Sequence, residues 1–447
     1  MSNEMRIRRD RSALSDGSLF GRRRRGIAPW KIFAWVTMMG VLGIVIWQFN
    51  TIQPQILAMV NISATATPVA QVYWKTAELA YWRGDLKTAI ANYREAVKQQ
   101  PKNVDLLYEL SRMLIYHSYD DRRNATDIAT YEIDPSSKQQ VLVDGALYWA
   151  QKAIEVAPNN PRAYTINCFA LLTDGNKLED AGRSCVHAVD LNPNDSESHA
   201  YLSATDFALL RFDTALAEAA KAVELNDKSI DAHTSYGLIL RYKGKNTASL
   251  EEYKKAAEIN PQLEFPYFNL AYFAIGTEQY SIAIAAYDRV LSMDKVSVKA
   301  YTRLCETYYR MGETELAKDN CSHAIDLDKE YTAAYKWYGQ VLYTRRDYED
   351  AITNFETCAK QEMADTSIAP DDRLTECWYL RGLSWYLLGD CDKAMAVFTE
   401  LLGWPTHDAN AIKFTQRGIN SCASTYPGYL TPTPVPTAIT PPAPILQ

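Results

Sequence analysis

A small residue returns at a spacing of about 34 residues through most of this chain of 447 residues. Six alanines carry the spacing most clearly, and each is followed seven positions later by a second small or apolar residue: Ala89, Ala215, Ala283, Ala317, Ala351 and Ala394. Because a helix repeats about every 3.6 residues, positions seven apart share one helix face. Self-similarity at this period predicts a stack of equal supersecondary units.

Each unit is expected to be a pair of antiparallel helices. Two helices approach closely only where the facing side chains are small, so Ala77, Gly237 and Ala271 on first helices should face the alanines of the second helices. Gly84 and Gly312 follow first helices and permit a tight turn. Since one pair cannot bury its apolar face alone, each unit should pack against its neighbours.

The first unit shows the full pattern of large, small, turn, small, large, small and stop positions: Tyr73, Ala77, Gly84, Ala89, Tyr93, Ala96 and Pro101. In this pattern the chain resembles the tetratricopeptide repeat, from about Ala70 to Ala423. The resemblance implies an all-α fold, a right-handed superhelical solenoid of stacked helix-turn-helix repeats. It also implies about nine repeats and a capping helix at the C-terminal end.

An apolar stretch precedes the repeats. Residues 32–49 carry no charge, and Trp30, Trp35 and Trp47 lie near the ends of this stretch, which suits a single transmembrane helix with interfacial aromatic side chains. A buried core helix and a cleavable signal peptide, cut near Ala64, are the alternatives. Residues 1–31 carry nine basic and three acidic side chains, so the N-terminus is expected to stay in the cytoplasm.

These features predict the domain organisation. Residues 1–29 form a basic cytoplasmic tail, 30–50 a transmembrane helix that acts as a signal anchor, and 51–69 a Ser/Thr/Ala-rich linker. The solenoid covers 70–424 and contains a polar insertion at 119–142. Residues 425–447 are rich in proline and threonine and are expected to form a disordered tail.

Charge and motifs exclude several functions. The whole chain has a net charge of −7 although its N-terminus is basic, so the solenoid is acidic and is not expected to bind nucleic acid. The sequence contains no nucleophile elbow, phosphate-binding loop, dinucleotide fingerprint or metalloprotease motif. We therefore expect no enzyme activity, no cofactor and no metal site.

All eight cysteines follow the apolar stretch, and on the repeats they fall at facing positions. The expected disulfide pairs are consecutive in sequence: Cys168 with Cys185, Cys305 with Cys321, Cys358 with Cys377, and Cys391 with Cys422. Free buried thiols are the alternative. Disulfides would place the solenoid in an oxidising compartment outside the cytoplasm, in agreement with the charge asymmetry.

Tetratricopeptide arrays hold peptides or partner proteins on the concave face formed by their first helices. The resemblance assigns to this face, as a groove for a protein or peptide partner, twelve aromatic residues: Trp74, Tyr81, Tyr108, Phe169, Phe207, Phe265, Phe268, Tyr272, Tyr309, Tyr343, Tyr379 and Tyr386. Asn269, Lys299 and Arg303 match part of a carboxylate clamp used in the family, but Thr234 and Leu238 stand where the clamp needs lysine and asparagine.

The expected function is a scaffold anchored in the cell membrane, with its tetratricopeptide domain outside the cytoplasm in a cell-envelope assembly. A cytosol-facing receptor for chaperones or precursor proteins is one alternative, and reduced cysteines would favour it. A saccharide-binding surface protein that uses the aromatic groove is another. The sequence does not identify the partner or the oligomeric state.

Overall fold

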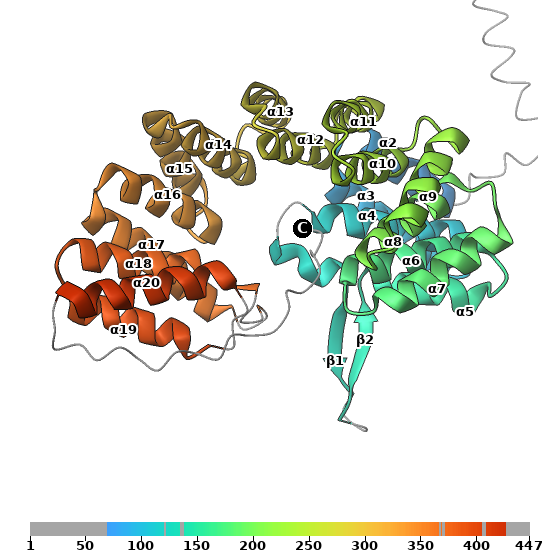
Figure 1. The fold of residues 1–447 in the computed structure, drawn as a ribbon. Coiled ribbons are helices and arrows are strands. Elements are labelled where there is room, and N and C mark those ends of the chain that lie inside the picture. Colours follow the sequence, from blue (N-terminus) through green and yellow to red (C-terminus); the bar gives the residue numbers. More distant parts are fainter. Residues whose placement is uncertain are drawn as a thin grey trace, which may run out of the picture. The chain divides into compact units, whose positions relative to one another are not determined.

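The computed structural model describes residues 69–425, apart from 120–121, 135–137, 366–367, 369–371 and 405–407. In this part of the chain the helices follow one another as pairs (Figure 1). The pairs are α2 (Val69–Trp82) with α3 (Leu86–Gln99), α4 (Val104–Ser118) with α5 (Ala146–Val156), α6 (Pro161–Asp174) with α7 (Leu178–Leu191), α8 (Ser196–Ala208) with α9 (Phe212–Leu225), α10 (Ile230–Tyr242) with α11 (Asn246–Ile259), α12 (Phe265–Gly276) with α13 (Tyr280–Met293), α14 (Val298–Met311) with α15 (Thr314–Leu327), α16 (Thr332–Arg345) with α17 (Tyr348–Ala364), and α18 (Glu376–Leu387) with α19 (Cys391–Leu402), before the last helix α20 (Ala409–Thr425).

The expected transmembrane helix lies outside the described residues. Among the helices of the described part, none combines the length and the apolar character that crossing a membrane requires.

One residue with a left-handed backbone closes the turn inside most pairs. It is a glycine at Gly84, Gly175, Gly244, Gly312 and Gly389, whereas Leu210, Glu278 and Arg346 adopt the same positive φ in the remaining turns. A non-glycine residue in this conformation costs about 1–2 kcal/mol. In those three turns, packing of the two flanking helices has to offset that cost.

Small residues set the distance between the two helices of a pair. Ala77 and Ala89 are fully buried where α2 meets α3. In later pairs a glycine faces a phenylalanine: a Cβ on Gly339 would lie 2.6 Å from the ring of Phe355, and a Cβ on Gly382 would lie 2.3 Å from that of Phe398. The alternation of small and large residues in the sequence therefore reflects the space between facing helices.

In four units, a tyrosine or histidine side chain of the first helix donates a hydrogen bond to a backbone carbonyl oxygen in the connection that precedes the helix. The ring donates to a carbonyl oxygen six residues earlier, as in Tyr164 to Pro158 (2.9 Å) and Tyr301 to Lys295 (3.4 Å), and the remaining two examples are His199 to Pro193 and His233 to Asp227. The other ring nitrogen of each histidine contacts a carboxylate, Glu218 or Glu252. The hydrogen bond to Glu218 raises the pKa of His199, against the opposing effect of burial.

The insertion after α4 contains strands as well as the expected polar turn. A short 3-10 helix (Arg122–Asp127) is followed by β1 (Thr130–Ile133) and β2 (Gln140–Asp144), which pair antiparallel. Figure 1 shows this hairpin projecting from the helices. Asp144 at its base accepts hydrogen bonds from Arg94 and Trp149, each at 2.8 Å, which attach the hairpin to α3 and α5.

The first unit also contacts the connection that joins the fifth unit to the sixth. The side-chain amide of the buried Asn260, between α11 and α12, donates to the carbonyl oxygen of Tyr81 at the end of α2 (3.0 Å). Beside it, a Cβ on Gly84 would lie only 1.9 Å from the carbonyl oxygen of Gln262. Neighbouring units pack in series, so this contact closes units one to six into a single packed set.

Candidate protein-binding surface

Half of the twelve aromatic residues expected in the groove are buried within the protein. Six residues expected in the groove are 8% exposed or less: Tyr81, Tyr108, Phe169, Phe207, Phe265 and Phe268. Phe169 stacks on Tyr201 with ring centroids 4.0 Å apart, and Tyr116 lies 4.6 Å from Phe265. A buried ring offers no area to a ligand, so at these six positions the protein's own side chains fill the expected groove.

Arg112 lies at the centre of this buried set. Its guanidinium donates to Glu109 (2.6 Å) and to Glu197 (3.1 Å), and the hydroxyl of Tyr108 also donates to Glu197. Burial opposes the charge of Arg112, yet the neighbouring carboxylates hold its pKa well above the ordinary value. Every charge of this group is paired, which is the condition for a buried ionic cluster to be tolerated.

Asp231 on α10 joins three first helices. It accepts hydrogen bonds from Tyr116 of α4 (2.6 Å) and Tyr201 of α8 (2.9 Å). Burial, and next the charge of Glu197, raise the pKa of Asp231 to about 6, against the opposing effects of the two hydroxyls and Arg112. Sequence analysis did not single out this residue, because its partners come from other units.

The C-terminal units expose more of their first-helix side chains. Tyr272 on α12 is 54% exposed, and Tyr309, Tyr343 and Tyr386 are half-buried on α14, α16 and α18. Tyr379 is buried and stacks on Phe414 of α20 at 5.4 Å. Trp74 on α2, at the opposite end of the array, is half-buried.

A connected group of cations and tyrosines lies on these C-terminal units. We call it the α14–α20 surface and define it by its residues: Arg303, Tyr309, Arg310, Lys336, Tyr343, Lys413 and Arg417. The ring of Tyr309 lies 5.9 Å from Trp337, which the Lys336 ammonium overlies at 4.1 Å. Burial, and next the neighbouring Tyr348, raise the pKa of Tyr343, while the charge of Arg417 acts in the opposite direction. The ring contact links α14 to α16, and the charge of Arg417 reaches the α16 tyrosine from α20.

The expected clamp residues do not form an open clamp. The ammonium of Lys299 donates to the carbonyl oxygen of Tyr119 and overlies the ring of Phe268 at 4.3 Å. Arg303 donates to Glu306 at 2.8 Å, and Asn269 is half-buried on α12. Both cations of the motif are therefore engaged within the chain. Sequence analysis missed Lys336. This residue follows Phe268 by two repeat lengths and so occupies the same position of its repeat, which is the signal that identifies it.

The structure brings the eight cysteines together in the four expected pairs. Cys168–Cys185 and Cys305–Cys321 lie within one helix pair each, with Cα atoms 5.2 Å apart. Cys358–Cys377 joins α17 to α18 and Cys391–Cys422 joins α19 to α20, at 6.0 and 5.7 Å. All four separations lie within the reach of a disulfide.

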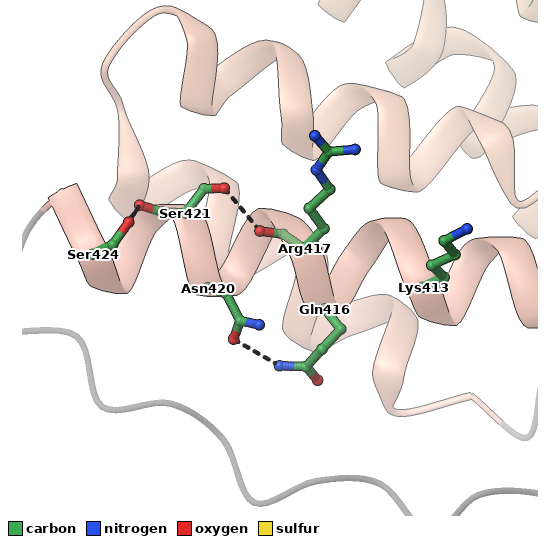
Figure 2. Close-up of a pocket in the computed structure, with 6 residues that line it drawn as sticks. All are labelled: Lys413, Gln416, Arg417, Asn420, Ser421 and Ser424. Atoms are coloured by element: carbon green, nitrogen blue, oxygen red, sulfur yellow. Dashed lines mark hydrogen bonds between the residues drawn. The ribbon is translucent and has the colours of Figure 1, made fainter.

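The exposed face of α20 that includes Lys413 and Arg417 of the α14–α20 surface is polar. A shallow hollow of about 530 Å³ is lined there by Lys413, Gln416, Arg417, Asn420, Ser421 and Ser424 (Figure 2). All six side chains come from one helix, so the hollow is open to solvent and lacks the enclosing walls of a small-molecule site. A polar outer face is what the terminal unit of a solenoid needs to remain soluble. Elsewhere in the described part, no group of three or more His, Cys, Asp or Glu side chains is arranged to hold a metal ion.

Comparisons with known proteins agree with this architecture. Models of the tetratricopeptide repeat family match residues 71–103, 230–263 and 266–296, which correspond to α2–α3, α10–α11 and α12–α13. Among solved structures, the APC/C hetero-tetramer Cut9-Hcn1 is similar with a TM-score of 0.50 and 12% identity, over 74% of this chain and 58% of that chain. The chain therefore contains tetratricopeptide repeats that form an α-helical solenoid.

Two curated relatives are also repeat proteins. The chain is 26% identical over 188 residues to the tetratricopeptide repeat-containing protein trd-1 of Caenorhabditis elegans, and 23% identical over 354 residues to a TPR repeat-containing protein of Methanocaldococcus jannaschii. These alignments cover 42% and 76% of this chain, but only 23% and 54% of the two relatives.

Proposed function

We propose that this protein is a membrane-anchored scaffold that binds a protein or peptide partner on its α14–α20 surface. The observation that carries the proposal is the partial exposure of Tyr309 and Tyr343 beside cations of α14, α16 and α20. Tyrosine offers a large contact area at a low entropic cost and is enriched among the residues that dominate binding energy. The buried aromatic residues of the first units offer no such area.

The anchor and the location of the array form part of the proposal. The uncharged residues 32–49 and the basic residues 1–31 support a signal anchor with the array outside the cytoplasm, in a cell-envelope assembly. Four cysteine pairs within bonding reach support the same location, because structural disulfides persist in oxidising compartments. Nothing in the described part of the chain resembles a metal centre, and the scaffold role needs no catalysis.

A photo-crosslinking amino acid at Tyr343 tests the binding role. In intact cells that express the full chain, we expect discrete crosslinked products at Tyr343 that Tyr309→Ser reduces, because the two side chains belong to one surface. The same crosslinker at Tyr131 of the hairpin, which is 48% exposed, is the matched control for an accessible tyrosine outside this surface.

Identical products from Tyr343 and Tyr131 would indicate random encounters and would contradict a specific surface. Absence of products at Tyr343 would contradict the proposed site, provided that the variant retains the thermal midpoint of the natural chain.

A further inference from the structure

The α14–α20 surface carries more positive than negative side chains, although the whole chain is acidic with a net charge of −7. Its cations are Arg303, Arg310, Lys336, Lys413 and Arg417, and the carboxylates that pair with them are Glu306 and Glu376. The buried cluster of the N-terminal units has the opposite balance, because Glu109, Glu197 and Asp231 surround Arg112 there. Positive charge is thus concentrated on the C-terminal units, beside the partly exposed Tyr309 and Tyr343.

Glu306 cannot neutralise its two neighbours. This carboxylate is 6% exposed and pairs with Arg303 at 2.8 Å and with Arg310 at 3.0 Å. One negative charge is therefore shared between two guanidiniums, whose side chains remain 41% and 48% exposed. The pair presents an excess positive charge to solvent beside Tyr309.

Lys336 is held in a fixed place between a carboxylate and an indole. Its side chain is only 12% exposed, its ammonium lies 3.6 Å from Glu376, and it overlies Trp337 at 4.1 Å. An ammonium positioned over an indole face is already partly desolvated and ordered, so less free energy is spent on ordering it when an anion binds.

Two further cations border the surface from α20. Lys413 and Arg417 are exposed, and Figure 2 shows both pointing to the same side of the helix. Within the described part of the chain, neither forms an ion pair. Arg417 is close enough to Tyr343 for its charge to act on the tyrosine hydroxyl.

We propose that the partner of the α14–α20 surface is an acidic, extended peptide segment of another protein, whose carboxylates pair with Arg310, Lys336 and Arg417 while its apolar or aromatic side chains pack on Tyr309 and Tyr343. This inference rests on the proposed scaffold function. Complementary charge accelerates encounter and excludes basic partners, and the tyrosines supply contact area.

Fluorescence anisotropy with the full-length chain tests the inference. One labelled peptide consists of repeated Glu-Glu-Tyr triplets, and its matched peptide consists of Gln-Gln-Tyr triplets. We expect the acidic peptide to bind at least tenfold more tightly. Its affinity should fall between about 0.1 M and about 1 M salt, as the screening length shortens from about 10 Å to about 3 Å.

Matched variants locate the effect. The double variant Lys336→Gln with Arg417→Gln should weaken binding of the acidic peptide about tenfold and leave binding of the neutral peptide unchanged. Lys318→Gln with Lys360→Gln makes the same change of charge on the second helices α15 and α17, at one half-buried and one exposed position like those of Lys336 and Arg417, and should have no effect. Equal thermal midpoints of the two double variants show that both are folded.

Three results would overturn the inference. Equal affinity for both peptides would show that a peptide binds without recognition of charge, and the proposed scaffold function would survive. An equal loss of affinity in the variant with Lys318→Gln and Lys360→Gln would show that binding depends only on the net charge of the chain. Binding of neither peptide also contradicts an acidic partner, and the scaffold function is then judged separately by crosslinking at Tyr343.

Discussion

Asp231 shows how a single residue can connect several repeats at a cost in stability. Its carboxylate is buried between the hydroxyls of Tyr116 and Tyr201, with Glu197 and Arg112 close enough to act on its charge. Burial and Glu197 raise its pKa from 3.8 to about 6, so the folded state binds the proton more tightly than the unfolded state does. The contribution of this group to the free energy of unfolding is therefore largest below pH 4 and is lost as the pH rises towards about 6.

Asp231→Asn is expected to remove this pH dependence, because an amide keeps one acceptor and carries no charge. Relative to the natural chain, the variant should gain about 3 kcal/mol in free energy of unfolding between pH 4 and pH 7. Thermal midpoints across this range check the prediction. Asp213→Asn, at a fully exposed carboxylate paired with Lys243, is the control and should show no such gain. A constant difference between Asp231→Asn and the natural chain would contradict the raised pKa.

At the scale of helices, the turns and the facing small residues follow the repeat spacing, and they could be predicted from the sequence. The sequence did not predict β1 and β2. Tyr131 and Ile133 alternate in the insertion as in a strand, but both are exposed, and the surrounding charges favoured a polar loop. A hairpin with two open edges is marginal by itself, so its form depends on the contacts of Asp144 with α3 and α5.

The last helix has a neighbour on one side only. Beyond α18 and α19 no repeat of the described part packs on α20, and Cys422 on its inner face lies opposite Cys391. In the chain-entropy model, a bridge that closes a loop of this length stabilises the folded state by about 3–4 kcal/mol. We therefore expect the Cys391–Cys422 pair to stabilise α20 more than the other cysteine pairs stabilise the inner helices.

Cys391→Ser with Cys422→Ser is expected to increase hydrogen exchange in residues 409–425 by more than tenfold and to leave α2–α11 unchanged. Cys305→Ser with Cys321→Ser, inside one helix pair that has neighbours on both sides, is the comparison and should have a smaller local effect. Mass spectrometry without reduction should find each pair joined in the natural protein. Free thiols at Cys391 and Cys422 would contradict both the bridge and the proposed oxidising location.

For the whole array, the first unit contacts the connection between the fifth and sixth units, and the first-helix faces before and after this connection differ in exposure. Asn260 and Gln262 reach α2 and its turn from a connection about 180 residues later. The enclosed faces are filled by buried aromatic and paired charged side chains, whereas Tyr309, Tyr343 and Tyr386 of the units after α12 stay partly exposed. This division decides where a partner can bind.

Gly84→Ala tests the closure, and Gly312→Ala is its matched control. Both glycines have positive φ, so both substitutions strain the backbone by about 1–2 kcal/mol. Only at Gly84 would the new Cβ meet another repeat, 1.9 Å from the Gln262 carbonyl oxygen, whereas at Gly312 no atom lies within 4 Å. Hydrogen exchange should therefore increase in residues 260–264 only for Gly84→Ala. Equal exchange in both variants would exclude the closure.

The sequence alone determined the repeat register, because small residues are needed wherever two helices approach, and the same register placed the cysteines opposite one another. Only the tertiary structure decided which aromatic positions face a partner. Tyr81 and Tyr343 occupy the same position of their repeats, yet Tyr81 is buried and Tyr343 is partly exposed. Tyr81 stacks on Tyr116, and Tyr116 in turn contacts Phe265, about 150 residues further along the chain. A local periodicity does not encode the packing of residues so far apart.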